Sequence, residues 1–197
     1  MQRKHYATTI TVILCGLLFI VIGSCFSAFL YQKEIVRVEN PKILTAVGVN
    51  VYSQDGKTEI NQLSLSKMNL GLKPATGEEN VETNIPSTIT DKQGSEGQYA
   101  KFKLKTTNNI SVSITNIVIK TKHDQDKVEE ERKNIMVAIE GVTKEAVSLE
   151  NNSVNLGSIE QGEEVKEYTF YVWLNAKASD EIEGSIISFD ISFSNIN

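Results

Sequence analysis

The chain begins with a long apolar segment that carries no charged side chain between Tyr6 and Gln32. It follows a short basic start that contains Arg3 and Lys4. A helix needs about 20 apolar residues to cross a hydrocarbon core of roughly 30 Å, and this segment is long enough. Basic residues stay on the cytoplasmic side, so the pattern predicts that everything after the segment lies outside. We therefore expect an exported protein that is inserted in the membrane, at least before any cleavage.

Three fates of this segment differ in what anchors the mature protein. A retained signal anchor fits its length, because the apolar core of a cleaved signal peptide is usually about 7 to 15 residues long. Lipidation at Cys25 fits the small residues directly before this cysteine. Cleavage after Ala28 would give a chain that starts at Phe29, and bulky Phe26 near the cut implies a dedicated signal peptidase rather than the general one. The sequence leaves the three fates open.

The rest of the chain has the length of a single domain. We divide the sequence into a signal peptide or signal anchor at 1–28, with the apolar segment at 6–32, a linker or donor segment at 29–42, and a folded domain at 43–197. Two of the 20 Lys and Arg lie in the leader, which leaves 18 against 25 Asp and Glu, a net charge of −7. This balance argues against nucleic acid and anionic lipid as partners. Because Cys15 and Cys25 both lie in the leader, the exported part contains no disulfide.

Apolar and polar side chains alternate along much of this part, which is typical of half-buried strands. The pattern favours an all-β fold, a two-sheet antiparallel sandwich of the jelly-roll or immunoglobulin-like kind, after the N-terminal apolar helix. We expect Tyr99, Phe102 and Leu104 to point inward, and Asn108 with Asn109 to form a hairpin turn. A charged run at 123–133 predicts one short, solvated helix. The predicted strands are 43–52, 60–70, 99–106, 111–120, 135–139, 146–149, 165–174 and 184–194.

The strand predicted at 165–174 is apolar on both faces. Phe170 and Val172 alternate to one side, and Tyr171 and Trp173 alternate to the other. Such a strand lies centrally, or it covers the core with one face and meets a loop or a partner with the other. Tyr171 and Trp173 are therefore our candidates for a partner-facing surface.

The residues that catalysis or metal binding would need are scarce. The two histidines are His5 in the leader and His123 in the charged run, which is too few for a three-histidine zinc site. The sequence has no Gly-x-Ser-x-Gly elbow, no cysteine after the leader and no phosphate-binding glycine loop. We expect no enzymatic activity, no cofactor and no metal site. Acidic runs at 124–126 and 180–183 do not match an EF-hand loop, and calcium binding by these loops stays open.

The end of the leader and the last strands resemble one family. The run Gly23-Ser24-Cys25-Phe26-Ser27-Ala28-Phe29 is similar to the cleavage region of the TasA and camelysin proteins, biofilm-matrix fibre subunits of Gram-positive bacteria that a signal peptidase of the SipW type processes. Cys25 stands where threonine is usual. The runs at 156–164, 168–174 and 183–193 are similar to the closing strands of TasA-like proteins. The zinc ligands of the metalloprotease activity described for camelysins are missing.

This resemblance implies a mechanism of assembly. In several family members the N-terminal strand of one subunit completes the sheet of the next, and fibres result. The donor segment of this chain would then lie within 29–52. The short Gly-Thr-Leu-aliphatic element that is usual after the cleavage site is replaced here by the residues at 46–51.

Two functions are compatible with these patterns. The first is an exported structural protein of the bacterial surface or extracellular matrix, a fibre subunit that assembles by strand exchange in biofilm. Its partners would be copies of itself and a SipW-like signal peptidase. The alternative is a membrane-tethered, monomeric β-sandwich with a binding or accessory role, held by a signal anchor or by lipid on Cys25. The sequence does not identify the ligand or partner of such a domain.

Overall fold

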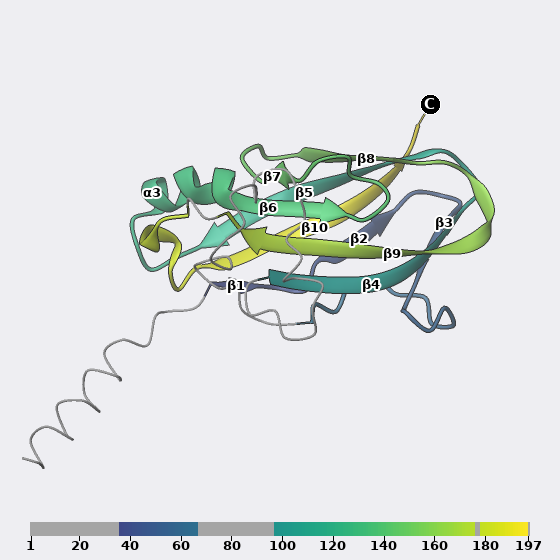
Figure 1. Cartoon of the computed structure of the whole chain (residues 1–197), viewed down its shortest axis with the longest axis horizontal. Helices are drawn as coiled ribbons and strands as arrows, with labels where there is room; N and C mark the ends of the chain where they lie inside the picture. Colours follow the sequence, from purple (N-terminus) through teal and green to yellow (C-terminus); the bar gives the residue numbers. More distant parts are fainter. Residues whose placement is uncertain (1–35, 67–96, 176–177, 197) are drawn as a thin grey trace, which may run out of the picture. The chain divides into compact units, whose positions relative to one another are not determined.

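The computed structural model describes residues 36–66, 97–175 and 178–196. These residues are mostly β and form two five-stranded sheets (Figure 1). The first sheet has the order β1-β10-β5-β8, with β2 also paired to β10, and the second has the order β3-β4-β9-β6-β7. The strands are β1 (Arg37–Val38), β2 (Lys42–Thr45), β3 (Val49–Tyr52), β4 (Gly97–Thr106), β5 (Ile110–Lys120), β6 (Ile135–Ile139), β7 (Val147–Ser148), β8 (Val154–Ile159), β9 (Gly162–Leu174) and β10 (Ile186–Asn195).

Side chains of both sheets form one hydrophobic core. Phe102 of β4 and Phe193 of β10 belong to different sheets, and their ring centroids lie 6.3 Å apart. The rings of Phe170 in β9 and Phe189 in β10 are 5.8 Å apart. Alternation explains this arrangement, because every second residue of β10 is buried while the serines and the aspartate between them face outward. The prediction of a β fold with two sheets is confirmed.

The N-terminal strands β1 and β2 run parallel to β10, which departs from the expected antiparallel pairing. Arg37 lies opposite Ile186, and Lys42 lies opposite Asp190. The strand predicted at 43–52 is divided between the sheets, because a turn at 46–48 separates β2 from β3. Residues 36–42, expected to be linker or donor segment, already take part in the first sheet.

The strand predicted at 60–70 is not formed by residues 60–66, and residues 67–70 lie outside the described part. Residues 59–65 instead cross the side of the domain where β2 and β3 form the sheet edges. The Ile60 amide donates to the Val51 carbonyl at 2.9 Å, and the Ile43 amide donates to the Asn61 carbonyl at 2.8 Å. Leu63 is buried at this edge, so the apolar alternation came from covering the core and not from a strand ladder.

β4 and β5 do not form the predicted hairpin. β4 pairs with β3 and β9, whereas β5 pairs with β10 and β8, so the connection at 107–109 passes from one sheet to the other. The Thr106 hydroxyl donates to the Asn108 carbonyl at 2.7 Å within this connection. Phe102 and Leu104 point inward as predicted. Tyr99 lies on the outer face instead. Side chains alternate along β4, so Tyr99 shares the face of Lys101 and Lys103.

Two further elements differ from the sequence prediction. β8 was not predicted, because a bulge at Leu156 and Gly157 interrupts its alternation. The predicted helix is shorter than 123–133: α3 (Gln125–Glu130) continues as the 3-10 turn η1 (Glu131–Asn134). Asp124 caps α3, and its carboxylate accepts a hydrogen bond from the Asp126 amide at 3.1 Å. A second 3-10 turn, η2 (Asp180–Ile182), precedes β10.

Candidate functional site

The strongest candidate site is the place of the N-terminal strand beside β10. Val36, Val38 and Ile43 enter the core from this strand and are buried. Leu44 lies opposite Ser192 of β10, and both residues belong to the outer face. An extended segment therefore supplies both backbone pairing and core side chains to a sheet that the rest of the chain builds.

The strand is interrupted between β1 and β2 at Asn40 and Pro41. Proline has no amide hydrogen, so the ladder cannot continue through this position. The Asn40 side-chain oxygen accepts from the Leu65 amide at 3.1 Å, and the Asn40 carbonyl accepts from the Gln62 side-chain amide at 2.9 Å. Residues 59–65 thus cover the outer edge of the N-terminal strand and shield it from solvent.

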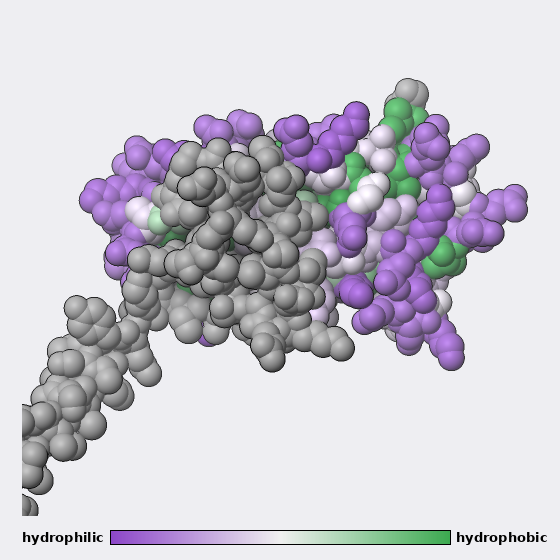
Figure 2. Space-filling view, in the orientation of Figure 1, coloured by the Kyte–Doolittle hydropathy of each residue, from purple (hydrophilic) through white to green (hydrophobic). Residues whose placement is uncertain are grey.

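The turn at 46–48 leads from this strand into the second sheet. The Ala46 amide donates to the Phe193 carbonyl at 2.9 Å, and the Val49 amide donates to the Ala46 carbonyl at 3.2 Å. Gly48 has a φ of +87°, a left-handed conformation that favours glycine. The Val47 side chain is 88% exposed. Figure 2 shows apolar side chains gathered near this end, where the chain leaves β10.

Tyr171 and Trp173, the predicted partner-facing residues, lie together on the outer face of the second sheet. They form a small cluster with Met136 and Ala138 that is separate from the main core, and Tyr99 packs against it. Tyr171 is 4% exposed and Trp173 is 1% exposed. A partner would reach these rings only after a local rearrangement, so the partner-facing role stays a prediction.

The two polar side-chain groups of this cluster differ in their hydrogen bonding. The Tyr171 hydroxyl donates to the Glu140 carboxylate at 2.9 Å. Burial, together with this negatively charged acceptor, raises the pKa of Tyr171 to about 12. Within the part of the chain that the structure describes, the Trp173 indole nitrogen is buried and has no hydrogen-bond partner. The tyrosine is thus held in place, whereas the tryptophan carries an unsatisfied donor.

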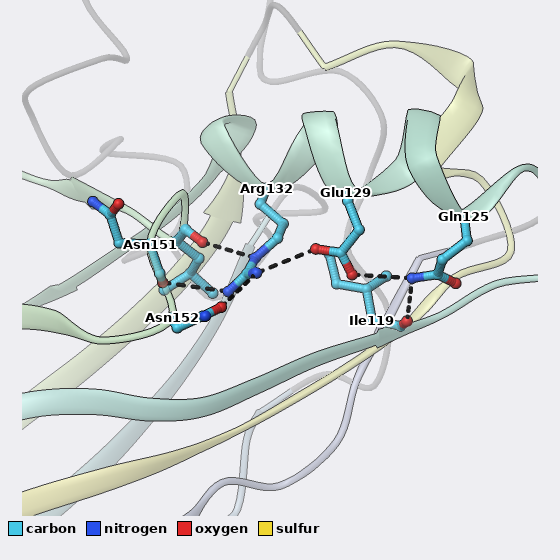
Figure 3. A network of polar contacts seen from close by, with 7 residues as sticks. Ile119, Gln125, Glu129, Arg132, Asn151 and Asn152 are labelled. Atoms are coloured by element: carbon cyan, nitrogen blue, oxygen red, sulfur yellow. Dashed lines mark hydrogen bonds and ion pairs between the residues drawn. The ribbon is translucent and has the colours of Figure 1, made fainter.

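A polar network centred on Arg132 fixes the end of the domain that carries α3 (Figure 3). The guanidinium donates to the Leu149 carbonyl at 3.1 Å, the Asn152 side-chain oxygen at 3.1 Å and the Asn151 carbonyl at 3.3 Å. It also pairs with Glu129 at 3.2 Å. Because the chain itself takes up four of its five N–H donors, this arginine is a structural group and not a free anion-binding site.

The two acidic runs make structural contacts in the described residues. Asp124 caps α3, and the Lys127 ammonium pairs with Glu181 at 3.1 Å. Glu131 accepts hydrogen bonds from Ser179 and from the Asn134 side chain. Burial raises the pKa of Glu131, but these hydrogen bonds outweigh burial and lower it overall. Across the three described ranges, no group of three or more His, Cys, Asp or Glu side chains comes together as a metal site would require.

The predicted cleavage and lipidation residues, Ala28, Phe29 and Cys25, lie outside the described residues, as does the apolar segment. The cleaved, lipidated and anchored fates therefore stay predictions. Among the helices in the described ranges, none has the length and apolar content that crossing a bilayer requires.

No family model matches this chain, and no curated protein matches it either. The resemblance to the TasA and camelysin proteins therefore rests on the sequence runs quoted above. The candidate site rests on the geometry of the N-terminal strand.

Proposed function

We propose that the chain is an exported structural protein of the bacterial surface or extracellular matrix. In this proposal it is a jelly-roll or immunoglobulin-like sandwich behind an N-terminal apolar helix, released by a SipW-like signal peptidase that cuts after Ala28. Copies join when segment 36–45 of one copy takes the equivalent place beside β10 of the next. The observation that carries the proposal is the parallel pairing of this segment with β10.

A vacated place beside β10 would expose both backbone groups and core side chains. Removing segment 36–45 would leave backbone groups of β10 unpaired and would open the core where Val36, Val38 and Ile43 had been. Each such side chain contributes about 1.5–3 kcal/mol when it is fully buried. An identical segment from a second copy restores every one of these contacts, which is the basis of strand exchange between protomers.

A test of this proposal must keep the segment in place, because its deletion would remove core side chains. We suggest the full-length double variant Leu44→Cys with Ser192→Cys, whose positions are register partners on the outer face. The control is Ser113→Cys with Ser192→Cys, which joins β5 to β10 within one copy. Copies with light and heavy isotopes are mixed while reduced, allowed to assemble, oxidised and digested.

Mass spectrometry of the disulfide-linked peptides then gives the answer. Strand exchange predicts mixed-isotope pairs in the 44–192 variant and unmixed pairs in the 113–192 control. Polymers whose 44–192 pairs are all unmixed would contradict strand exchange. Terminal sequencing of protein from cells is the companion measurement, because a start at Phe29 supports a released subunit, whereas a lipidated Cys25 or an intact Met1 means a tether.

The alternative function is a membrane-tethered, monomeric domain with a binding or accessory role. It is favoured by the separate aromatic cluster of Tyr171 and Trp173 and by the unpaired indole donor. This alternative predicts no polymer, no mixed-isotope pairs and a retained or lipidated leader. The variant Trp173→Ala would then weaken binding of a partner that the intact protein captures.

A further inference from the structure

We propose that the turn formed by Ala46, Val47 and Gly48 is the hinge that controls how readily segment 36–45 is exchanged, an inference that rests on the proposed function. The turn is the covalent link between β2 in the first sheet and β3 in the second. A copy that keeps its own segment must close this turn. A copy that donates the segment to a neighbour must open it.

Groups from separate parts of the fold hold the turn closed. The Val47 carbonyl accepts from the Asn108 side-chain amide at 3.3 Å and from the Asn195 side-chain amide at 3.4 Å. Asn108 lies in the connection between β4 and β5, whereas Asn195 ends β10. The connection between the two sheets and the end of β10 therefore both hold the closed turn, through bonds to one exposed carbonyl.

Gly48 makes the closed conformation depend on a residue without a side chain. Its carbonyl accepts from the Thr107 amide at 3.0 Å, and its φ of +87° is unfavourable for other residues. A Cβ at this position would collide with the Thr107 hydroxyl. Any larger residue would thus strain the closed turn, whereas an opened, extended turn would relieve the strain.

The turn decides the balance between the two states because the other contacts of segment 36–45 are the same in both. Segment 36–45 makes the same pairing and packing whether it lies on its own β10 or on that of a neighbour, so these contacts do not favour one state. The free-energy difference between the two states therefore depends on whether the turn is closed or open, and on the protein concentration. Weakening the closed turn therefore shifts the population toward exchange. It also speeds exchange, because the turn must open before segment 36–45 can leave its own β10.

The experiment compares Gly48→Ala with Gly141→Ala in full-length protein that carries the 44–192 cysteine pair. Gly141 has a similar φ of +79° but no atom within 4 Å of an added Cβ, and it lies outside the hinge. Both changes carry the backbone cost of a left-handed alanine. The isotope-mixing readout described above, repeated with oxidation at successive times after mixing, measures the rate at which copies exchange their strands.

We expect Gly48→Ala to raise the exchange rate about tenfold, which corresponds to the left-handed strain released on opening. Gly141→Ala should change the rate far less. A second variant, Asn108→Ala with Asn195→Ala, keeps Gly48 and should also accelerate exchange. The hinge is refuted when both hinge variants exchange no faster than Gly141→Ala while the parent protein still exchanges. Unmixed pairs in every variant would instead refute the proposed function, and the hinge with it.

Discussion

The two ends of the two-sheet domain are held by different chemistry. At the α3 end, charged side chains reach across several elements, and Arg132 alone joins η1 to three residues of the segment before β8. At the opposite end, neutral amides and backbone groups hold the turn at 46–48. Opening the α3 end would break the charged hydrogen bonds of a partly buried guanidinium, whereas opening the other end exposes neutral groups that water can satisfy. We therefore expect the end with the turn at 46–48 to rearrange at a lower free-energy cost.

The most direct way to break this comparison is Arg132→Ala. The change removes four protein contacts, so we expect the free energy of unfolding to fall by about 2–3 kcal/mol, as for losses of charged hydrogen bonds. Urea denaturation measures this loss. The control Lys133→Ala alters an exposed neighbour and should stay within about 0.5 kcal/mol of the parent. Equal effects of the two variants would show that the α3 end is not held by Arg132.

A second change at the same end should stabilise the domain. Gln98 lies in β4 opposite Val172, it is fully buried, and both polar atoms of its side chain lack hydrogen-bond partners in the described part of the chain. Gln98→Met keeps the length of the side chain and removes the unsatisfied amide, so we expect a gain of about 1–2 kcal/mol in thermal or urea unfolding. A loss of stability would mean that the amide is satisfied, for example by buried water.

The smallest expected effect is a response of the α3 end to acid. The pKa of Glu131 is lowered in the folded state, so its contribution is present above pH 4.5 and is lost as the pH falls through the folded-state pKa. Glu131→Gln should remove this part of the acid dependence in unfolding measured from pH 6 to pH 2. The exchange rate at the opposite end should not follow the same titration. A common midpoint for both would show that the two ends are coupled.

Much of the fold is predictable from period-two patterns. β5, β6 and β10 lie within one or two residues of their predicted positions, because their alternation has one buried face and few interruptions. The pattern fails in two places. Near Leu63 the alternation arises because the segment covers a sheet edge without forming a ladder. In β8 a bulge at Leu156 and Gly157 interrupts the alternation.

Pairing and site geometry were harder to predict. Asn108 and Asn109 mark the end of a strand, but the hairpin predicted from them is wrong. Local turn chemistry does not say whether the next strand joins the same sheet or the opposite one. The contact of Asn195 with Val47 joins residues 148 positions apart, so no short motif announces it. Gly48 did carry a signal, because an isolated glycine in a strand pattern suggests a bend.

The parallel course of β2 and β10 also sets where the chain enters and leaves the domain. Because the first and last strands point the same way, the chain enters beside Ile186 and leaves beyond Asn195, at the other end of β10. A strand of ten residues spans roughly 33 Å. A domain that is attached through its N-terminus would therefore point the end of the domain near Asn195 outward. A domain repeated along a filament would give the filament a direction, with two different ends.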